Sequence, residues 1–140
     1  TEIIGAFLAR ELAKEGHTSI NSGKDICVIT PETNANNQMI FRDNIQKHVF
    51  NKQILLLISS ASTGKTINRS VECLQYYNGQ LAGVASIFSA INEHNGIQIN
   101  SIFTSEDLNN YETMSAHDCK LCKSGQKVDA IINSFGYSKI

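Results

Sequence analysis

Residues with the chemistry of an anion site follow the most apolar stretch of the chain. Residues 54–66 read ILLLISSASTGKT, so a run of five aliphatic side chains ends at small hydroxylated residues and then at Gly-Lys-Thr. Free backbone N–H groups, hydroxyl groups and a lysine ammonium are the donors that proteins use to bind phosphate. We therefore predict a phosphate-binding loop here. Its residues are Ser62, Thr63, Gly64, Lys65 and Thr66.

Three predicted elements position this loop. Residues 53–58 lack polar alternation, which is typical of a central parallel strand buried on both faces. Residues 66–77 carry apolar side chains at helical spacing and stop at an Asn-Gly pair, and residues 81–88 predict the next strand. A strand, helix and strand in this order form a βαβ unit, which places the strand end and the helix start at one edge of the sheet.

The rest of the chain predicts a single α/β domain over residues 1–140, with a mainly parallel sheet flanked by helices. We expect a first helix that ends at Gly16, a strand at 26–30, a mobile loop after Pro31, a short helix at 41–49 and a strand at 97–103. A short helix capped by Thr104 or Ser105 follows, and the segment from about residue 115 reads as irregular. The chain begins in a helical pattern without a methionine, which leaves room for a preceding N-terminal segment.

Composition narrows the classes of partner. The chain has 140 residues, 41% of them hydrophobic, a formal net charge of -1 and no block of like charges, so we expect no nucleic-acid or membrane partner. It has neither a signal-peptide pattern nor an apolar run long enough to span a bilayer, and four cysteines beside a sizeable core read as reduced thiols. We expect a soluble cytoplasmic protein.

The stretch 54–66 resembles the phosphoribosyl pyrophosphate (PRPP) motif of type I phosphoribosyltransferases. That motif has an apolar run, two adjacent acids, two further residues and Thr-Thr-Gly-Gly-Thr, and the last five positions match residues 62–66 here. The order of elements over residues 1–104 is similar to the orotate phosphoribosyltransferase branch. The resemblance implies that the loop holds the 5′-phosphate of PRPP, and that a nucleobase such as orotate displaces pyrophosphate with the help of magnesium. It also implies a homodimer.

The sequence departs from that family at two places. The positions of the two acids, which contact the ribose hydroxyls in the family, hold Ile58 and Ser59. The segment before the expected mobile loop reads Ile-Thr-Pro-Glu at 29–32, without the basic residues of the orotate branch. We therefore expect binding of phosphorylated ribose to persist better than turnover.

Three functions remain open from the sequence. The first is phosphoribosyl transfer to a base, and the second is a non-catalytic module that senses PRPP or a nucleotide. The third is a P-loop phosphotransferase, whose motif G-x-x-x-x-G-K-[ST] would need a glycine where this chain has Ser59. The resemblance favours the first function, and the missing acids are the feature that favours the second.

A cysteine pair near the C-terminus forms a second candidate site. Cys119 and Cys122 have the C-x-x-C spacing that lets two thiolates bind one zinc ion, and His117 lies just before them. A fourth ligand would have to come from a distant residue such as His94 or Cys73. Two free thiols are the alternative, and a redox pair is less favoured because the motif follows no strand.

Several other polar and aromatic residues have simpler interpretations. We expect His17 and His48 to be surface or capping residues, and the acids Glu32 and Asp43, although able to meet magnesium, to be solvated. Near the end of the chain, Phe135 and Tyr137 are expected to pack against the domain or against the second subunit of a dimer.

Overall fold

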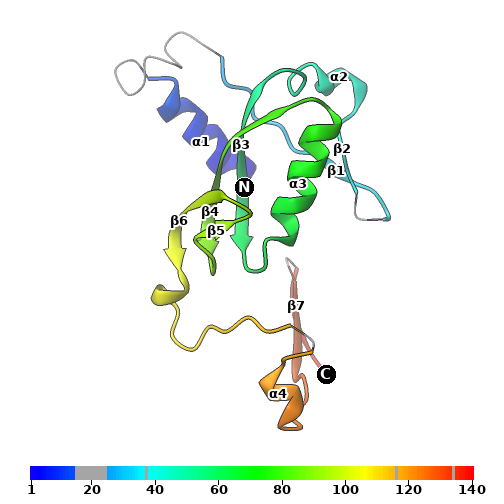
Figure 1. Cartoon of the computed structure of the whole chain (residues 1–140), viewed down its shortest axis with the longest axis vertical. Helices are drawn as coiled ribbons and strands as arrows, with labels where there is room; N and C mark the ends of the chain where they lie inside the picture. The colour runs from blue at the N-terminus through cyan, green and yellow to red at the C-terminus, as the bar shows by residue number, and fades with distance from the viewer. Residues whose placement is uncertain (15–24, 37, 116, 134) are drawn as a thin grey trace.

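A computed structural model describes residues 1–14, 25–36, 38–115, 117–133 and 135–140 of the chain (Figure 1). Its centre is a four-stranded sheet with the order β3-β4-β6-β5. Strands β3 (Gln53–Ala61), β4 (Gln80–Ser89) and β6 (Ile97–Thr104) run parallel, whereas the short edge strand β5 (Glu93–His94) is antiparallel to β6. The fold is therefore α/β with a mixed sheet, and the expectation of a mainly parallel sheet holds for the three long strands only.

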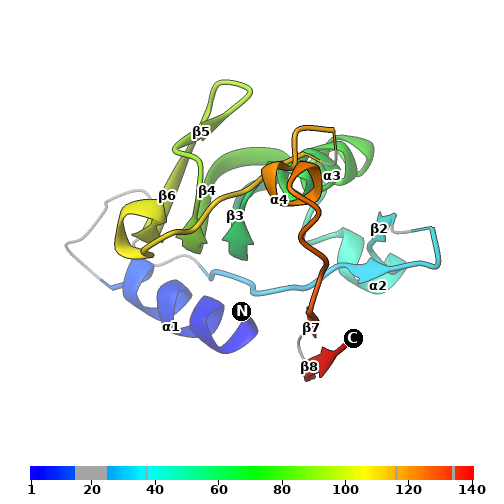
Figure 2. The same ribbon diagram turned by 90° about the horizontal axis from the view of Figure 1, so that it is seen from below.

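Helices cover both faces of this sheet (Figure 2). Helix α3 (Lys65–Tyr76) packs on one face, where its Ile67 joins Ile58 of β3 and Val84 of β4 in a buried cluster. Helix α1 (Glu2–Leu12) packs on the other face, where the absence of a side chain at Gly5 lets it approach Val28 and Leu57. The first half of β3 is apolar on both faces, but only partly covered, since Leu55 is 42% exposed.

A second buried cluster lies against the C-terminal half of α3. It joins Cys73 and Leu74 of the helix to Phe41 and Val49, which flank the short helix α2 (Asp43–Gln46). The hydroxyl of Tyr77 accepts a hydrogen bond from the backbone N–H of Phe41 at 3.2 Å. Helix α3 is thereby held between two clusters, which fixes the position of its N-terminus.

The region between α1 and α2 differs from its prediction. Residues 25–30 form no strand, because their apolar side chains pack individually: Val28 against α1 and Ile29 against the second cluster. The expected mobile loop instead holds a hairpin of β1 (Glu32–Thr33) and β2 (Met39–Ile40). Helix α1 ends at Leu12, earlier than predicted, and Gly16 lies outside the described residues.

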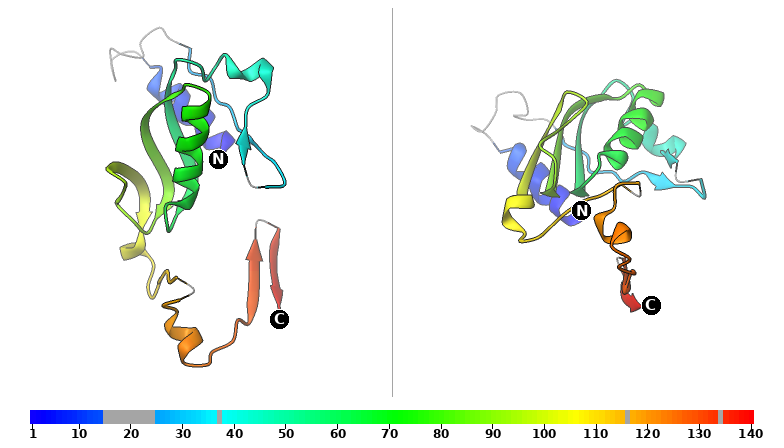
Figure 3. Two further views of the ribbon diagram at one scale, coloured as in Figure 1. Left: turned by 45° about the vertical axis from the view of Figure 1, so that its right-hand side comes forward. Right: turned by 60° about the horizontal axis from the view of Figure 1, so that its bottom comes forward.

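The C-terminal segment is also more regular than predicted. After the 3-10 helix η1 (Ser105–Asp107), which Thr104 caps as expected, the chain forms helix α4 (Lys120–Lys123) and a hairpin of β7 (Ala130–Asn133) and β8 (Gly136–Lys139). These strands have four residues each, too few for a clear alternation in the sequence. We call the described part of residues 115–140 the C-terminal arm, and it projects away from the sheet (Figures 1 and 3). Among the described residues, no helix is long and apolar enough to cross a membrane.

Candidate phosphate-binding site

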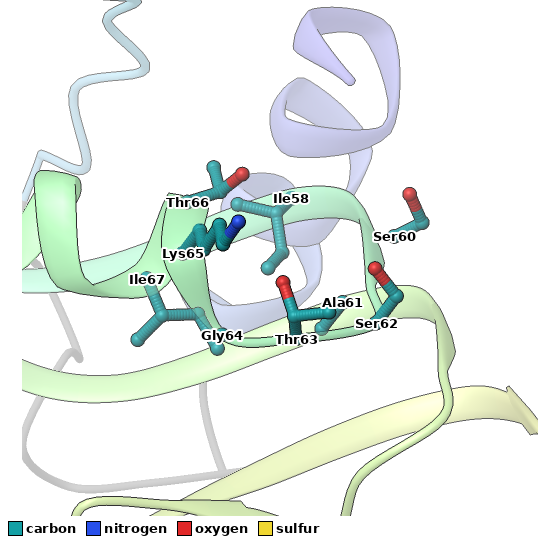
Figure 4. Close-up of a pocket in the computed structure, with 9 residues that line it drawn as sticks. All are labelled: Ile58, Ser60, Ala61, Ser62, Thr63, Gly64, Lys65, Thr66 and Ile67. Carbon is teal, nitrogen blue, oxygen red and sulfur yellow. The ribbon is translucent and has the colours of Figure 1, made fainter. Parts of the chain in front are cut away.

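The five residues predicted to bind phosphate lie together at one edge of the sheet. Strand β3 ends at Ala61 and helix α3 begins at Lys65, so residues 62–64 form the connecting turn. The turn borders a cavity of about 120 Å³ (Figure 4), well above the roughly 10–15 Å³ that one water molecule needs. Its lining consists of Ile58, Ser60, Ala61, Ser62, Thr63, Gly64, Lys65, Thr66 and Ile67.

Gly64 gives this turn its shape. It caps α3 with φ of 73°, in the left-handed region that glycine adopts without steric cost. A Cβ atom at this position would also overlap the imidazole ring of His94. The turn therefore requires glycine for two independent reasons.

The start of α3 leaves backbone donors available. The first N–H group of the helix with a described backbone acceptor is that of Asn68, which bonds the carbonyl of Gly64 at 2.9 Å. Gly64 offers no side-chain cap, and the first turn of α3 contains no acidic residue. The N–H groups of Lys65, Thr66 and Ile67 thus form a positive helix terminus that no described side chain neutralises.

Two side chains add to these donors. Figure 4 shows the ammonium group of Lys65 and the hydroxyl of Thr63 pointing into the space beside the turn. Within the described ranges, Lys65 forms no ion pair and the lining of the cavity contains no carboxylate. The resulting electrostatic environment favours an anion.

The positions aligned with the family's acidic pair have different surroundings from each other. Ile58 is 8% exposed and belongs to the core beneath the cavity, whereas Ser59 is exposed. A carboxylate at Ile58 would therefore be buried in the apolar cluster unless a partner compensated its charge. The core packing fits isoleucine at this place.

A polar cluster that no motif predicted lies behind the turn. His94 lies on β5, and its Nε2 is 2.8 Å from Oδ1 of Asn68 in the first turn of α3. The amide of Asn95 donates to the same oxygen at 3.2 Å. The hairpin turns at Asn95 and Gly96, both with positive φ, so the Asn-Gly dipeptide was the signal that predicts this turn. These contacts hold the β5–β6 hairpin against the start of α3.

The cysteine pair lies on the C-terminal arm, apart from the loop (Figure 1). Cys119 caps α4, and its Sγ accepts the N–H of Cys122 at 3.1 Å. A hydrogen bond from the Cys122 side chain lowers the pKa of Cys119, and the same interaction raises the pKa of Cys122. In the part of the chain that the structure describes, no group of three possible metal ligands occurs. Zinc binding by Cys119, Cys122 and His117 stays a prediction.

The remaining candidates lie elsewhere in the fold. Glu32 is bound by the guanidinium of Arg42, with Nε 2.8 Å and Nη2 2.6 Å from its two oxygens, and Asp43 begins α2. His48 is exposed in the turn after α2, as expected, and His17 lies outside the described residues. The side chains of Phe135 and Tyr137 are exposed on the arm and do not pack against the described part of the domain.

Comparisons with known proteins leave the family open. A scan against models of protein families finds no match, and a search of curated proteins finds no significant relative.

Proposed function

We propose that this protein binds PRPP or a nucleotide through the 5′-phosphate, at the turn between β3 and α3. The observation that carries this proposal is a left-handed Gly64 at the start of a helix whose first N–H groups face a cavity with a lysine and no carboxylate. Phosphate oxygens are strong acceptors and match this set of donors. The similarity of residues 54–66 to the PRPP motif supports a phosphorylated ribose as the ligand.

In this proposal each group has a simple role. The N–H groups of Lys65 and Thr66 and the hydroxyl of Thr63 donate to the phosphate oxygens, while the Lys65 ammonium balances their charge. Gly64 gives the turn the left-handed conformation that starts α3. The cluster of His94 and Asn68 holds the turn before the ligand arrives, so little ordering of the loop opposes binding.

The lining of the cavity favours a binding module over a transferase. Transfer of a phosphoribosyl group develops positive charge on the ribose, and the described lining has no carboxylate to stabilise it. The same lack means that these residues do not fit a magnesium ion held by the protein, because magnesium is bound through carboxylates in such sites. Magnesium would enter only as the counter-ion of the PRPP diphosphate. We therefore propose a sensor of phosphorylated ribose as the function.

Calorimetric titration tests this function. PRPP and a nucleoside 5′-monophosphate should bind with and without magnesium, while the nucleoside without its phosphate should not. Loss of a hydrogen bond to a charged group costs about 1.5–3 kcal/mol, so Thr63→Ala should weaken binding roughly 10-fold or more. Thr113→Ala, which removes an exposed hydroxyl outside the cavity, is the matched control and should bind normally. Equal binding of the nucleoside and its monophosphate would contradict the proposal.

A further inference from the structure

The two thiols of the C-terminal arm are arranged as one half of a metal site. Helix α4 is a single turn, and the hydrogen bond from the Cys122 N–H to Cys119 Sγ brings residue 122 to the sulfur of residue 119. Cys122 is exposed and Cys119 is half-buried, and both are free thiols. Two thiolates in one C-x-x-C turn bind a single zinc ion.

This half-site is incomplete within the described chain. Structural zinc is held tetrahedrally by four ligands, with cysteine and histidine preferred. The described residues place no third histidine, cysteine, aspartate or glutamate in position to join the pair. His117, the nearest histidine in sequence, is exposed and belongs to no such group. A zinc ion held by the pair would take two further ligands from outside this described arrangement.

The hairpin that follows α4 in the chain is also uncovered by the described residues. Ile132 is 78% exposed and Phe135 is 98% exposed, and Tyr137 and Ile140 of the same hairpin are largely accessible as well. The hairpin has only two strands, and an isolated hairpin of this size is at best marginally stable in water. The hairpin stands apart from the sheet and its helices (Figure 3), in agreement with the exposure of these side chains.

We propose that a second copy of this chain completes the site, so that Cys119 and Cys122 of two arms hold one zinc ion and the two hairpins cover each other. An interface with twofold symmetry presents the same patch from both chains. Two identical C-x-x-C turns therefore supply the four thiolates that zinc requires, and the adjoining hairpins meet by the same operation. The proposal does not depend on the function proposed for the phosphate loop.

The lysines near the thiols are suited to a zinc ion held by the cysteines of two chains. Four thiolates around one zinc ion carry a net charge of about -2. Lys120 and Lys123 flank the cysteines within α4, so two arms would bring four lysines to the complex. Each lysine forms an exposed ion pair, Lys120 with Glu112 at 3.6 Å and Lys123 with Asp118 at 3.9 Å, and exposed pairs of this kind are weak. These lysines remain able to offset the excess negative charge.

Metal analysis combined with a measurement of mass tests this inference. The full chain, purified under reducing conditions with zinc present, should contain about one zinc per two chains and sediment as a dimer. Chelation should remove the metal and yield monomers. Cobalt substitution should give the absorption bands of a tetrahedral site with four thiolates.

Variants separate the arm from the rest of the fold. Cys119→Ser and Cys122→Ser should each lose the metal and the dimer, whereas Cys27→Ser, which changes another exposed cysteine, should keep both. Binding of a nucleoside monophosphate should be the same in all three variants. One zinc per chain in a monomer, a dimer that chelation leaves intact, or no zinc in the reduced protein would each overturn the inference.

Discussion

Gly64 is the residue whose substitution tests the phosphate loop most sharply. A valine at this position would have to adopt a left-handed conformation, which costs about 1–2 kcal/mol. Its side chain would also clash with the ring of His94. We expect Gly64→Val to abolish binding of PRPP in a calorimetric titration. Gly125→Val is the matched control, because Gly125 has φ of 77° but open space around it. Normal binding by Gly64→Val, in protein that circular dichroism shows to be folded, would place the ligand elsewhere.

The cysteines should differ in reactivity. Hydrogen bonding from the Cys122 side chain lowers the pKa of Cys119, so its thiolate forms at lower pH, whereas the pKa of Cys122 is raised. Burial also raises the pKa of Cys73, whose thiol bonds the Met39 carbonyl. In metal-free protein, the pH midpoint of alkylation, measured by peptide mass spectrometry, should therefore be lower for Cys119 than for Cys122. Cys73 should react last. Identical midpoints for the arm cysteines would show that the thiols do not interact.

At the scale of the element, α3 depends on the cluster that it forms with the sheet. Ile67 is 0% exposed, and truncating a buried isoleucine to alanine typically costs about 2–5 kcal/mol. We expect Ile67→Ala to lower the free energy of unfolding by this amount in urea denaturation, and to weaken phosphate binding because α3 carries the N–H groups. Ile102→Ala, at a position 69% exposed, should cost less than about 0.5 kcal/mol. A small loss at Ile67 would mean that other contacts position α3.

The sequence predicted the β3-α3-β4 unit because its signals are strong and local. The uninterrupted apolar run predicts a buried strand, and the helical spacing of apolar residues predicts the helix after it. The Asn-Gly pair then predicts where this helix ends. All five loop residues followed from the same pattern and line one cavity.

Other elements depend on contacts that the sequence does not state. Residues 25–30 have the composition of a strand, but they form no strand hydrogen bonds with a neighbouring segment. Ile29 packs against the second buried cluster instead. Strand β5 has only two residues, too few for a strand pattern to predict the position of His94. Only the Asn-Gly pair that follows it indicates a turn there. The arm strands are equally short. Short elements carry too few residues for a periodicity to develop.

We expect the protein as a whole to bind PRPP but to transfer its phosphoribosyl group very weakly or not at all. The family's acidic pair is replaced by Ile58 and Ser59, and the expected loop cation is absent from the segment before Glu32. If the acidic pair and the cation each contribute about 3 kcal/mol, the transition state loses about 6 kcal/mol, or roughly four orders of magnitude in rate. We expect a pyrophosphate-release assay with PRPP and orotate, or with other bases, to show very weak turnover or none. Robust turnover would show that other carboxylates replace the pair.

We propose that the start of α3 binds the phosphate of a phosphorylated ribose. An NMR titration of the backbone amides tests this binding directly. In ¹⁵N-labelled protein titrated with PRPP, the amide signals of Gly64, Lys65 and Thr66 should shift in a saturable way, with those of the C-terminal arm unchanged. The same signals should not respond to a nucleoside without phosphate. Saturable shifts confined to other parts of the chain, or no shifts at any PRPP concentration, would contradict the account.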